Sequence, residues 1–340
     1  MTRLAAAGRR ALPMGICNAI APGKIFWREA ERFIKSSLCV TNTRVRIVKL
    51  SLIISTYNQP ESLAKVLAGV SLQKIPPDEI LIADDGSGES TREVIEAWRG
   101  EAKIPTHHLW HPDNGFLKTT ILNKAVAAAA GEYLIFLDGD CVPHPLFISD
   151  HRAMAERGCW VQGRRCFVRE KFVGEFAPGK ISVWKWILRG RLARPAKCFR
   201  LPCALVLRNQ KQRGILGCNM AFWRDDVLAV NGFDESYVGR GMGADSDLGS
   251  RIYNLGRARK FVYGRAIVFH LDHPIMPRPH SAQNRKKLYD VLRTGKTRCE
   301  RGVDQYLLKT PILPRADLNC ENAQSDLVPD TEDFEDSVAK

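Results

Sequence analysis

The sequence has no cysteine pair with the spacing of a zinc module and no apolar run long enough to span a membrane. Its ten cysteines are scattered, with no CxxC pair and no CxxC…HxxxH pattern, which argues against a zinc module. A chain of 340 residues does not need a disulfide framework, so we expect reduced thiols and a cytoplasmic setting. The longest apolar candidate, residues 125–137, is interrupted by Gly131 and Glu132. It therefore falls short of the roughly 20 residues that a membrane-spanning helix needs.

Acidic residues are scarce outside residues 319–340. The chain has 51 Lys and Arg against 37 Asp and Glu, a net charge of +14. Residues 319–340 hold seven acids and one lysine, a net of −6, so residues 1–318 carry +20. This excess of positive charge in residues 1–318 indicates anionic partners, such as nucleotide phosphates, an anionic lipid surface or nucleic acid. No recognised nucleic-acid module is present, so we do not expect nucleic acid to be the partner.

Short apolar runs alternate with helix-period segments from residue 49 onward. The apolar runs predict buried strands at residues 52–56, 79–83 and 133–137, with helices between them. This alternation predicts an α/β fold, with a mostly parallel central sheet and helices on both faces. No GxGxxG follows the first strand, which argues against a dinucleotide-dependent enzyme. Ligands of such sheets bind at the carboxyl ends of the strands.

Two pairs of aspartates fall at this edge. Asp138 and Asp140 follow one apolar strand, and Asp84 and Asp85 follow an earlier one. Two carboxylates one residue apart in a turn suit Mg²⁺ or Mn²⁺, which keep open positions for substrate phosphates. A carboxylate in the earlier turn can bind a uracil edge or a ribose hydroxyl. The alternative is that these aspartates only form turns.

Three segments in this region resemble the signatures of family 2 glycosyltransferases. They read IISTYN at residues 53–58, IADDGS at 82–87 and FLDGD at 136–140. The resemblance implies the GT-A fold, in which a nucleotide-binding half joins an acceptor-binding half. It also implies a nucleotide-sugar donor, a metal ion at Asp140 and a basic residue near the diphosphate. The donor-binding residues that we expect are Ser55, Tyr57, Asp84, Asp85, Lys118 and Asp138. A solvated lysine in a first helical turn is the alternative for Lys118.

The second half is similar to the C-terminal part of β-galactosyltransferases and chondroitin-type polymerases. The similar segments are residues 217–223, 231–235 and 239–248. In those enzymes a GWGGED-x-D run holds the catalytic acid. When the acidic residues of the two runs are aligned, Asp245 occupies the position of the family's general base and Asp247 that of its later Asp. Ala244 occupies the position of a Glu that binds sugar in those enzymes. The resemblance implies that Asp245 is the general base and that Asp247 contacts the acceptor. The alternative for Asp245 is a helix N-cap.

Four further side chains complete the expected site. His270 directly follows the strand at residues 266–269, where related enzymes place a metal-binding histidine, and His273 is the second candidate. A purely structural histidine is the alternative for both. Asn219 and Trp223 flank an apolar stretch and are expected at the acceptor pocket, since aromatic faces pack on sugar rings. Core packing is the alternative for Trp223.

Residues 159–213 hold 14 basic residues, two acids and interleaved aromatics. Within them, residues 183–189 mix Trp with Lys and Arg, as interfacial segments do. The basic-aromatic stretch at residues 180–213 predicts docking on an anionic membrane surface, peripheral on the inner face of the cytoplasmic membrane. The alternative is an insertion that folds over the acceptor cleft.

We therefore expect an inverting glycosyltransferase that depends on Mn²⁺ or Mg²⁺, because one base without a protein nucleophile implies inversion. The expected donor is a UDP-sugar. The expected acceptor is a saccharide, free or lipid-linked, in a bacterial lipopolysaccharide, lipooligosaccharide or capsule pathway. The alternatives are a non-catalytic sugar-nucleotide scaffold and a chondroitin-type polymerase-like transferase. The expected parts are an appendage (1–47), a nucleotide-sugar half (48–150), a basic-aromatic region (151–215), a catalytic half (216–305) and an acidic tail (306–340).

Overall fold

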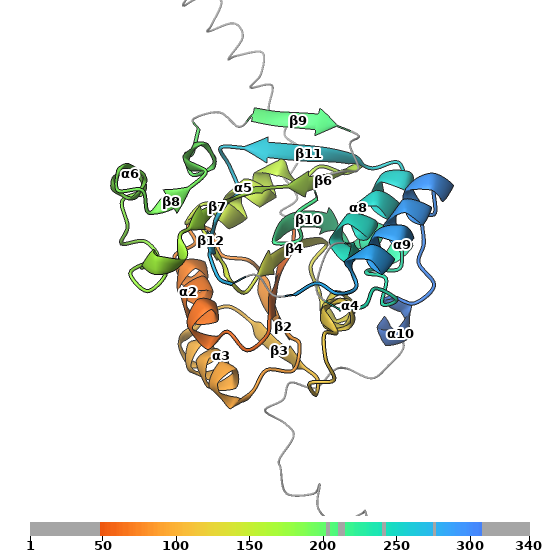
Figure 1. Cartoon of the computed structure of the whole chain (residues 1–340), viewed down its shortest axis with the longest axis horizontal. Helices are drawn as coiled ribbons and strands as arrows, with labels where there is room; N and C mark the ends of the chain where they lie inside the picture. The colour runs from red at the N-terminus through yellow and green to blue at the C-terminus, as the bar shows by residue number, and fades with distance from the viewer. Residues whose placement is uncertain (1–47, 202–204, 210–214, 240–242, 275–276, 308–340) are drawn as a thin grey trace, which may run out of the picture. The chain divides into compact units, whose positions relative to one another are not determined.

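The computed structural model describes residues 48–201, 205–209, 215–239, 243–274 and 277–307 (Figure 1). The appendage expected at 1–47 lies outside these ranges, as does the tail expected at 306–340 except for its first two residues. An eight-stranded sheet forms the centre, in the order β3-β2-β1-β4-β10-β6-β11-β9. Its strands are β1 (Leu50–Thr56), β2 (Glu79–Asp84), β3 (Thr106–Trp110), β4 (Tyr133–Asp138), β6 (Cys159–Gln162), β9 (Leu205–Asn209), β10 (Asn219–Trp223) and β11 (Ala258–Tyr263).

The sheet is mostly parallel, as the sequence predicts. Strands β3, β2, β1 and β4 are parallel neighbours. Strand β10 is antiparallel to both β4 and β6, so β6 and its parallel neighbour β11 run in the same direction as the first four strands. Strand β9 closes the edge, antiparallel to β11. The carboxyl ends of β1, β2 and β4 therefore lie at one edge of the sheet.

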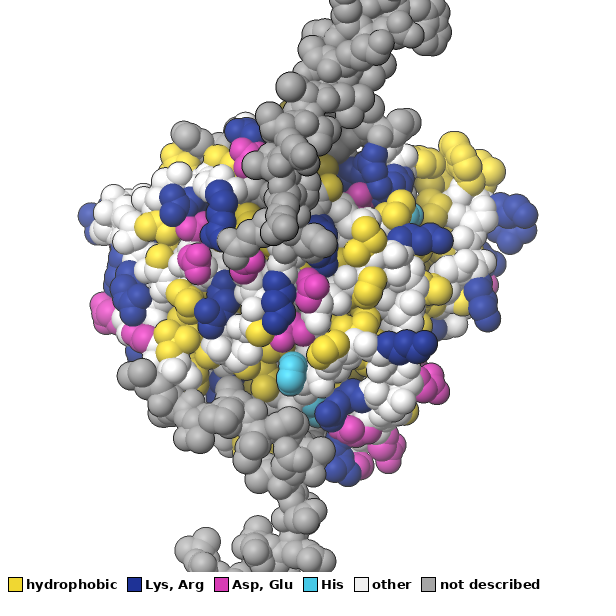
Figure 2. Space-filling view, turned by 180° about the vertical axis from the view of Figure 1, so that it is seen from behind, with side chains coloured by type: hydrophobic (Ala, Val, Ile, Leu, Met, Phe, Trp, Pro, Cys, Tyr) yellow, Lys and Arg dark blue, Asp and Glu magenta, His cyan; other side chains and the backbone are white. Residues whose placement is uncertain are grey.

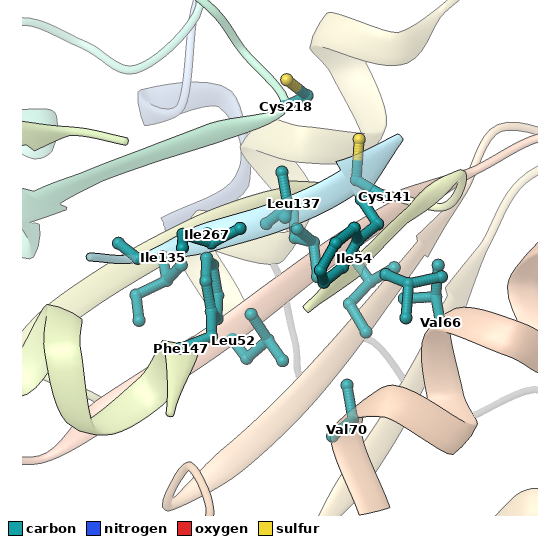
Figure 3. Close-up of a cluster of buried hydrophobic side chains, with 14 of the residues drawn as sticks. Leu52, Ile54, Val66, Val70, Ile135, Leu137, Cys141, Phe147, Cys218 and Ile267 are labelled. Atoms are coloured by element: carbon teal, nitrogen blue, oxygen red, sulfur yellow. The ribbon is translucent and has the colours of Figure 1, made fainter. Parts of the chain in front are cut away.

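Helices cover both faces of this sheet, because its strands are apolar on both sides. In β1, Leu52 and Ile54 pack into one core and the intervening Ile53 into the other, as the two-residue period of a strand requires. The first core, shown in part in Figure 3, lies against α2 (Pro60–Ser71), α3 (Glu89–Glu101) and α5 (Phe147–Met154). The second lies against α4 (Lys118–Ala128), α7 (Arg224–Ala229) and α8 (Ala244–Asn254).

A second, four-stranded sheet has the order β5-β12-β7-β8. Its strands are β5 (Cys141–Pro143), β7 (Arg164–Val168), β8 (Leu192–Ala193) and β12 (Ile267–Leu271). The chain passes from the central sheet to this one through the turn Asp138-Gly139-Asp140. A Cβ on Gly139 would lie 2.8 Å from the carbonyl oxygen of Ser55, so the turn packs too closely on β1 for a side chain there. This contact fixes the two aspartates against β1.

The basic-aromatic region is not a separate insertion. It supplies β6 and β9 to the central sheet and β7 and β8 to the second sheet. It also contains α6 (Val183–Leu188) and the 3₁₀ turns η1 (Glu170–Phe172) and η2 (Pro195–Lys197). The remaining helices are α9 (Ser281–Thr294) and α10 (Asp304–Leu307).

The helices are short compared with a membrane span. Across the part of the chain that the structure describes, none is long and apolar enough to cross a bilayer. The six cysteines within those ranges are all buried and free, in keeping with the expected reduced thiols: Cys141, Cys159, Cys166, Cys198, Cys218 and Cys299.

Candidate active site

Two adjoining pockets lie at the carboxyl edge of the central sheet. The larger, about 560 Å³, extends toward α8 and the second sheet. The smaller, about 160 Å³, extends over the ends of β1 and β2. Five residues line both pockets and mark where they meet: Phe116, Lys118, Asp138, Asp140 and His273. Residues from distant parts of the chain thus form one continuous site.

Asp138 and Lys118 form an ion pair where the pockets meet. Lys118 Nζ donates to Asp138 Oδ1 at 2.6 Å, and Ser55 Oγ donates to the same oxygen at 3.0 Å. Burial opposes the charge of Lys118, but the carboxylates of Asp138 and Asp245 outweigh it and raise its pKa above the ordinary value. Lys118 is therefore a fixed cation at this point. The structure places it in the site, as expected, and not in bulk solvent.

Asp140 lies between two histidines. Its Oδ2 is 3.1 Å from His273 Nε2 and 3.5 Å from His270 Nε2. Burial disfavours the charge of Asp140, but the hydrogen bond with His273 and the charge of His270 lower its pKa to about 2. The hydrogen bond to Asp140 in turn raises the pKa of His273 to about 9.

This donor set fits a divalent metal ion. The ligand atoms of Asp140, Cys141 and His270 lie within 4.8 Å of one another. His273 Nδ1 lies 3.0 Å from the carbonyl oxygen of Pro274, so Nε2 is the nitrogen directed at Asp140, an arrangement usual for metal-binding histidines. The sequence favours His270 over His273, and the structure brings both histidines to Asp140.

Asp245 lines the larger pocket from the first turn of α8. Burial raises the pKa of its carboxyl group above the ordinary value, against the opposing effect of the Lys118 charge. A Cβ on Gly217 would lie 2.1 Å from Asp245 Oδ2, so only glycine leaves room for the carboxylate there. The N-cap of α8 is Gly243, so the N-cap alternative for Asp245 is wrong.

The smaller pocket holds three of the four remaining donor-binding candidates: Ser55, Tyr57 and Asp85. Asp85 is held by His111 Nε2 at 2.8 Å and by the Leu117 N–H at 3.1 Å, which ties it to the start of α4. Asp84 is different. It is fully buried, within 2.9 Å of His108 Nε2, and accepts the N–H of Ser87. The structure therefore corrects the expected donor contact of Asp84 to a role in holding the turn.

The structure also corrects the expected roles of Asn219 and Trp223, which line neither pocket. Asn219 is fully buried; its Nδ2 donates to the carbonyls of Arg164 and Ala266, and its Oδ1 lies 3.0 Å from His151 Nε2. Trp223 packs at the other end of β10, with its ring 5.1 Å from that of Tyr133. Because β10 is antiparallel to β4, it carries Trp223 away from the carboxyl edge.

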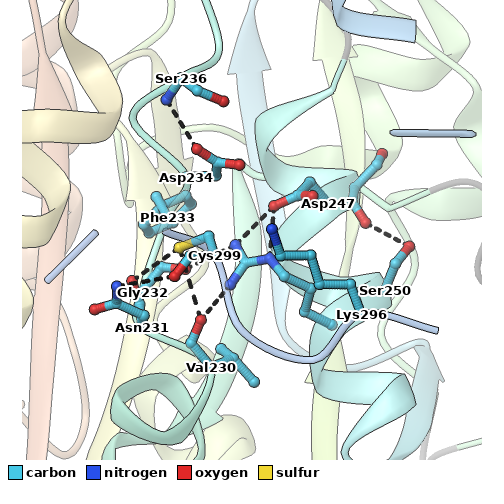
Figure 4. A network of polar contacts seen from close by, with 12 residues as sticks. Val230, Asn231, Gly232, Phe233, Asp234, Ser236, Asp247, Ser250, Lys296 and Cys299 are labelled. Atoms are coloured by element: carbon cyan, nitrogen blue, oxygen red, sulfur yellow. Dashed lines mark hydrogen bonds and ion pairs between the residues drawn. The ribbon is translucent and has the colours of Figure 1, made fainter. Parts of the chain in front are cut away.

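Asp247 belongs to a buried polar network (Figure 4). It forms an ion pair with Arg251 at 2.7 Å, and both side chains are at most 1% exposed. Arg251 also donates to the carbonyls of Val230 and Gly232. The carboxylate of Asp247 therefore cannot reach an acceptor in this structure, and the expected acceptor contact is corrected to a structural ion pair.

The pocket also contains residues that the sequence analysis did not assign. Among them are Phe116, Arg165, Phe167, Arg194, Tyr237, Asp272 and Arg278. Arg165 and Phe167 lie two residues apart on β7, so they project to the same side of the strand. The two-residue spacing indicates this strand, whereas the basic and aromatic composition of residues 159–213 drew the interpretation to membrane docking, with an insertion as the alternative.

Two family models match adjoining parts of the chain. Residues 51–208 match the model described as glycosyl transferase family 2. Residues 204–274 match the model described as the N-terminal domain of galactosyltransferase. The chain thus carries a family 2 glycosyltransferase domain followed by a galactosyltransferase-like segment. These matches include the aspartate-rich turns, Asp245 and both histidines.

Named relatives agree with this assignment. The chain is 26% identical over 248 residues to chondroitin synthase from Escherichia coli, covering 66% of this chain and 35% of that protein. It is 33% identical over 107 residues to hyaluronan synthase from Pasteurella multocida, covering 31% of this chain and 11% of that protein. The chain therefore spans about a third or less of the length of these relatives.

Solved structures confirm the GT-A fold. The structure of GalNAc-T7 with UDP, GalNAc and Mn²⁺ superimposes with a TM-score of 0.52 at 16% identity. The match covers 73% of this chain and 48% of that one. The α/β architecture expected from the sequence is therefore confirmed.

Proposed function

We propose that the chain is an inverting, metal-dependent glycosyltransferase that transfers a sugar from UDP to a saccharide acceptor. One observation carries the proposal. Asp138, Asp140, Lys118 and Asp245 come from three separated segments and line the same pocket. Such a convergence provides a cation, a metal site and a base around one reacting centre.

Asp245 is the base in this mechanism. Its carboxylate accepts the proton of the acceptor hydroxyl as that oxygen attacks the anomeric carbon. The transition state resembles an oxocarbenium ion, so attack from the face opposite the leaving diphosphate inverts the anomeric centre. Burial favours proton uptake, because it raises the pKa of Asp245 above that of a solvated aspartate.

Asp140, His270 and His273 would hold the metal ion. When bound, the ion neutralises the negative charge that develops on the leaving diphosphate. The mixed carboxylate and imidazole donors favour Mn²⁺ over Mg²⁺, which prefers oxygen ligands. Lys118 lies beside this site and supplies a fixed positive charge for the same diphosphate. Mn²⁺ and UDP are also the ligands named for the GalNAc-T7 structure.

Calorimetric titration of UDP, GDP and CMP, with and without Mn²⁺, tests this proposal. We expect UDP to bind only in the presence of Mn²⁺, and Asp245→Asn to retain that binding while kcat falls by two orders of magnitude or more. A chain that binds no nucleotide in any metal condition would refute the transferase mechanism and favour a scaffold. Normal kcat in Asp245→Asn would refute only the role of the base.

For the acceptor, we propose a lipid-linked saccharide of a bacterial cell-surface glycan, reached by docking on an anionic membrane. Helix α6 presents Trp184 and Leu188, which are 63% and 80% exposed. The exposed Lys185 and Arg189 flank them, a composition typical of interfacial helices. Figure 2 shows hydrophobic and basic side chains side by side at the edge where α6 lies.

Vesicle sedimentation tests the docking. The wild-type chain should sediment with phosphatidylglycerol vesicles and not with phosphatidylcholine vesicles. Trp184→Ser combined with Leu188→Ser should abolish sedimentation, whereas Tyr289→Ser, which alters an equally exposed aromatic on α9, should not. Unchanged sedimentation of the double variant would show that α6 does not bind lipid.

A further inference from the structure

One wall of the larger pocket is strongly basic. Arg165 on β7 and Arg194, which precedes η2, line this pocket but not the smaller one that holds Ser55, Tyr57 and Asp85. The basic wall is therefore on the acceptor side of the shared aspartates, away from the proposed nucleotide side.

Both guanidinium groups lie on one aromatic ring. Arg165 Cζ is 5.0 Å and Arg194 Cζ is 4.9 Å from the centre of the Phe167 ring. The strand register explains this arrangement, because β8 pairs with β7 so that Ala193 lies opposite Phe167, which places Arg194 beside that ring. Two like charges are thus held around a single apolar surface.

Within the described ranges, neither Arg165 nor Arg194 forms a salt bridge, although the charges of Asp138 and Asp245 act on Arg165 from further away. Arg165 Nη1 donates to Cys218 Sγ at 3.6 Å, and its Nε is buried with no hydrogen-bond partner. Two of the pocket aspartates form ion pairs elsewhere, Asp138 with Lys118 and Asp140 with the histidines, and a third, Asp245, has no ion pair within 4.0 Å among the described residues. The fourth, Asp272, is exposed.

The pKa of a neighbouring lysine is affected by the same positive charges. Burial lowers the pKa of Lys197, and the charges of Arg164, Arg194 and Arg165 lower it further. Like charges held close together repel one another, and an anion bound between them removes this repulsion. Paired guanidinium groups are the usual protein ligands for carboxylate and phosphate because their planar donors match two oxygens at once.

We propose that Arg165 and Arg194, held on Phe167, bind a carboxylate or phosphate group carried by the acceptor saccharide. This inference rests on the proposed transferase function, and it assigns the acceptor to the class of anionic sugars. Phe167 lies beside His270, with ring centres 5.0 Å apart, so the bound anionic group lies next to the reacting centre. The two arginines would then orient the attacking hydroxyl toward Asp245.

The proposal is tested by comparing the affinities of three small sugars while UDP and Mn²⁺ saturate the donor side. Glucuronate, glucose 6-phosphate and glucose are each titrated and followed by ligand-observed NMR. We expect at least one of the two anionic sugars to bind fivefold or more tightly than glucose. Arg194→Gln, at an exposed position, should bring that ratio close to one, and Arg165→Gln should do the same. Arg169→Gln, at an exposed position outside both pockets, should leave the ratio unchanged.

Three outcomes would overturn the inference. The first is equal or no binding of the three sugars, and the second is a preference that survives both arginine substitutions. The third is a loss of UDP affinity in Arg165→Gln or Arg194→Gln, which would assign these groups to the donor diphosphate. A wild-type chain that does not bind UDP refutes the proposed function separately, because the donor titration is made before any sugar is added.

Discussion

A methyl group at position 217 tests whether the position of the Asp245 carboxylate controls the reaction. A Cβ on Gly217 would lie 2.1, 2.3 and 2.6 Å from Oδ2, Cγ and Oδ1 of Asp245, whereas ordinary contact begins near 3.4 Å. In Gly217→Ala the carboxylate must therefore move by about 1 Å or more. Misplacement of a catalytic group by about 1 Å can lower a rate about 100-fold. That factor corresponds to about 2.7 kcal/mol of activation free energy.

Steady-state kinetics and nucleotide titration separate this effect from a loss of folding. We expect kcat of Gly217→Ala to fall about 100-fold, while UDP affinity changes little, because Asp245 lines the larger pocket and not the smaller one proposed for the nucleotide. Gly174→Ala is the matched control, since its new Cβ would meet no atom within 4 Å. If Gly217→Ala folds and keeps the wild-type kcat, the assignment of Asp245 as the base is wrong.

Three further predictions concern the metal, the proton and the fold. Asp140→Asn should abolish Mn²⁺-dependent UDP binding in calorimetry, and a variant that keeps this binding would place the metal elsewhere. Burial raises the pKa of Asp245, and only its ionised form accepts a proton. As the pH is lowered, kcat should therefore begin to fall at a pH well above the ordinary aspartate pKa of about 4. A pH–rate profile that stays flat down to that pH would contradict this. Arg251→Met leaves the Asp247 carboxylate buried without its partner, so urea unfolding should show a loss of about 3–5 kcal/mol. A loss below about 1 kcal/mol would show that Asp247 takes up its proton or finds water.

The sequence was informative where a motif coincides with a strand end. Asp138, Asp140 and Asp85 follow strands whose carboxyl ends meet at one edge, so their convergence could be predicted from the alternation of strands and helices. Lys118 could be placed for a similar reason, because α4 begins at this edge.

Side-chain direction was harder to predict. Asp245 and Asp247 are two residues apart on a helix, so their side chains point about 200° apart, and only one of them can face the pocket. Asp84 is the last residue of β2 and Asp85 the first residue after it, so their side chains point to opposite sides. Trp223 was misplaced because the direction of β10 cannot be read from its own residues. Long-range strand pairing decides that direction.

In the four-stranded sheet, the strands that carry Asp140 and His270 are not the strands that carry the basic wall of the larger pocket. Asp140 and His270 are tied through neighbouring backbone, since β5 pairs with β12 and the Leu271 N–H donates to the Asp140 carbonyl. Arg165 and Arg194 lie further out, on β7 and just after the edge strand β8. Substitutions in the β7–β8 strand pair can therefore alter the proposed acceptor wall while the β5–β12 pair keeps the proposed metal ligands in place.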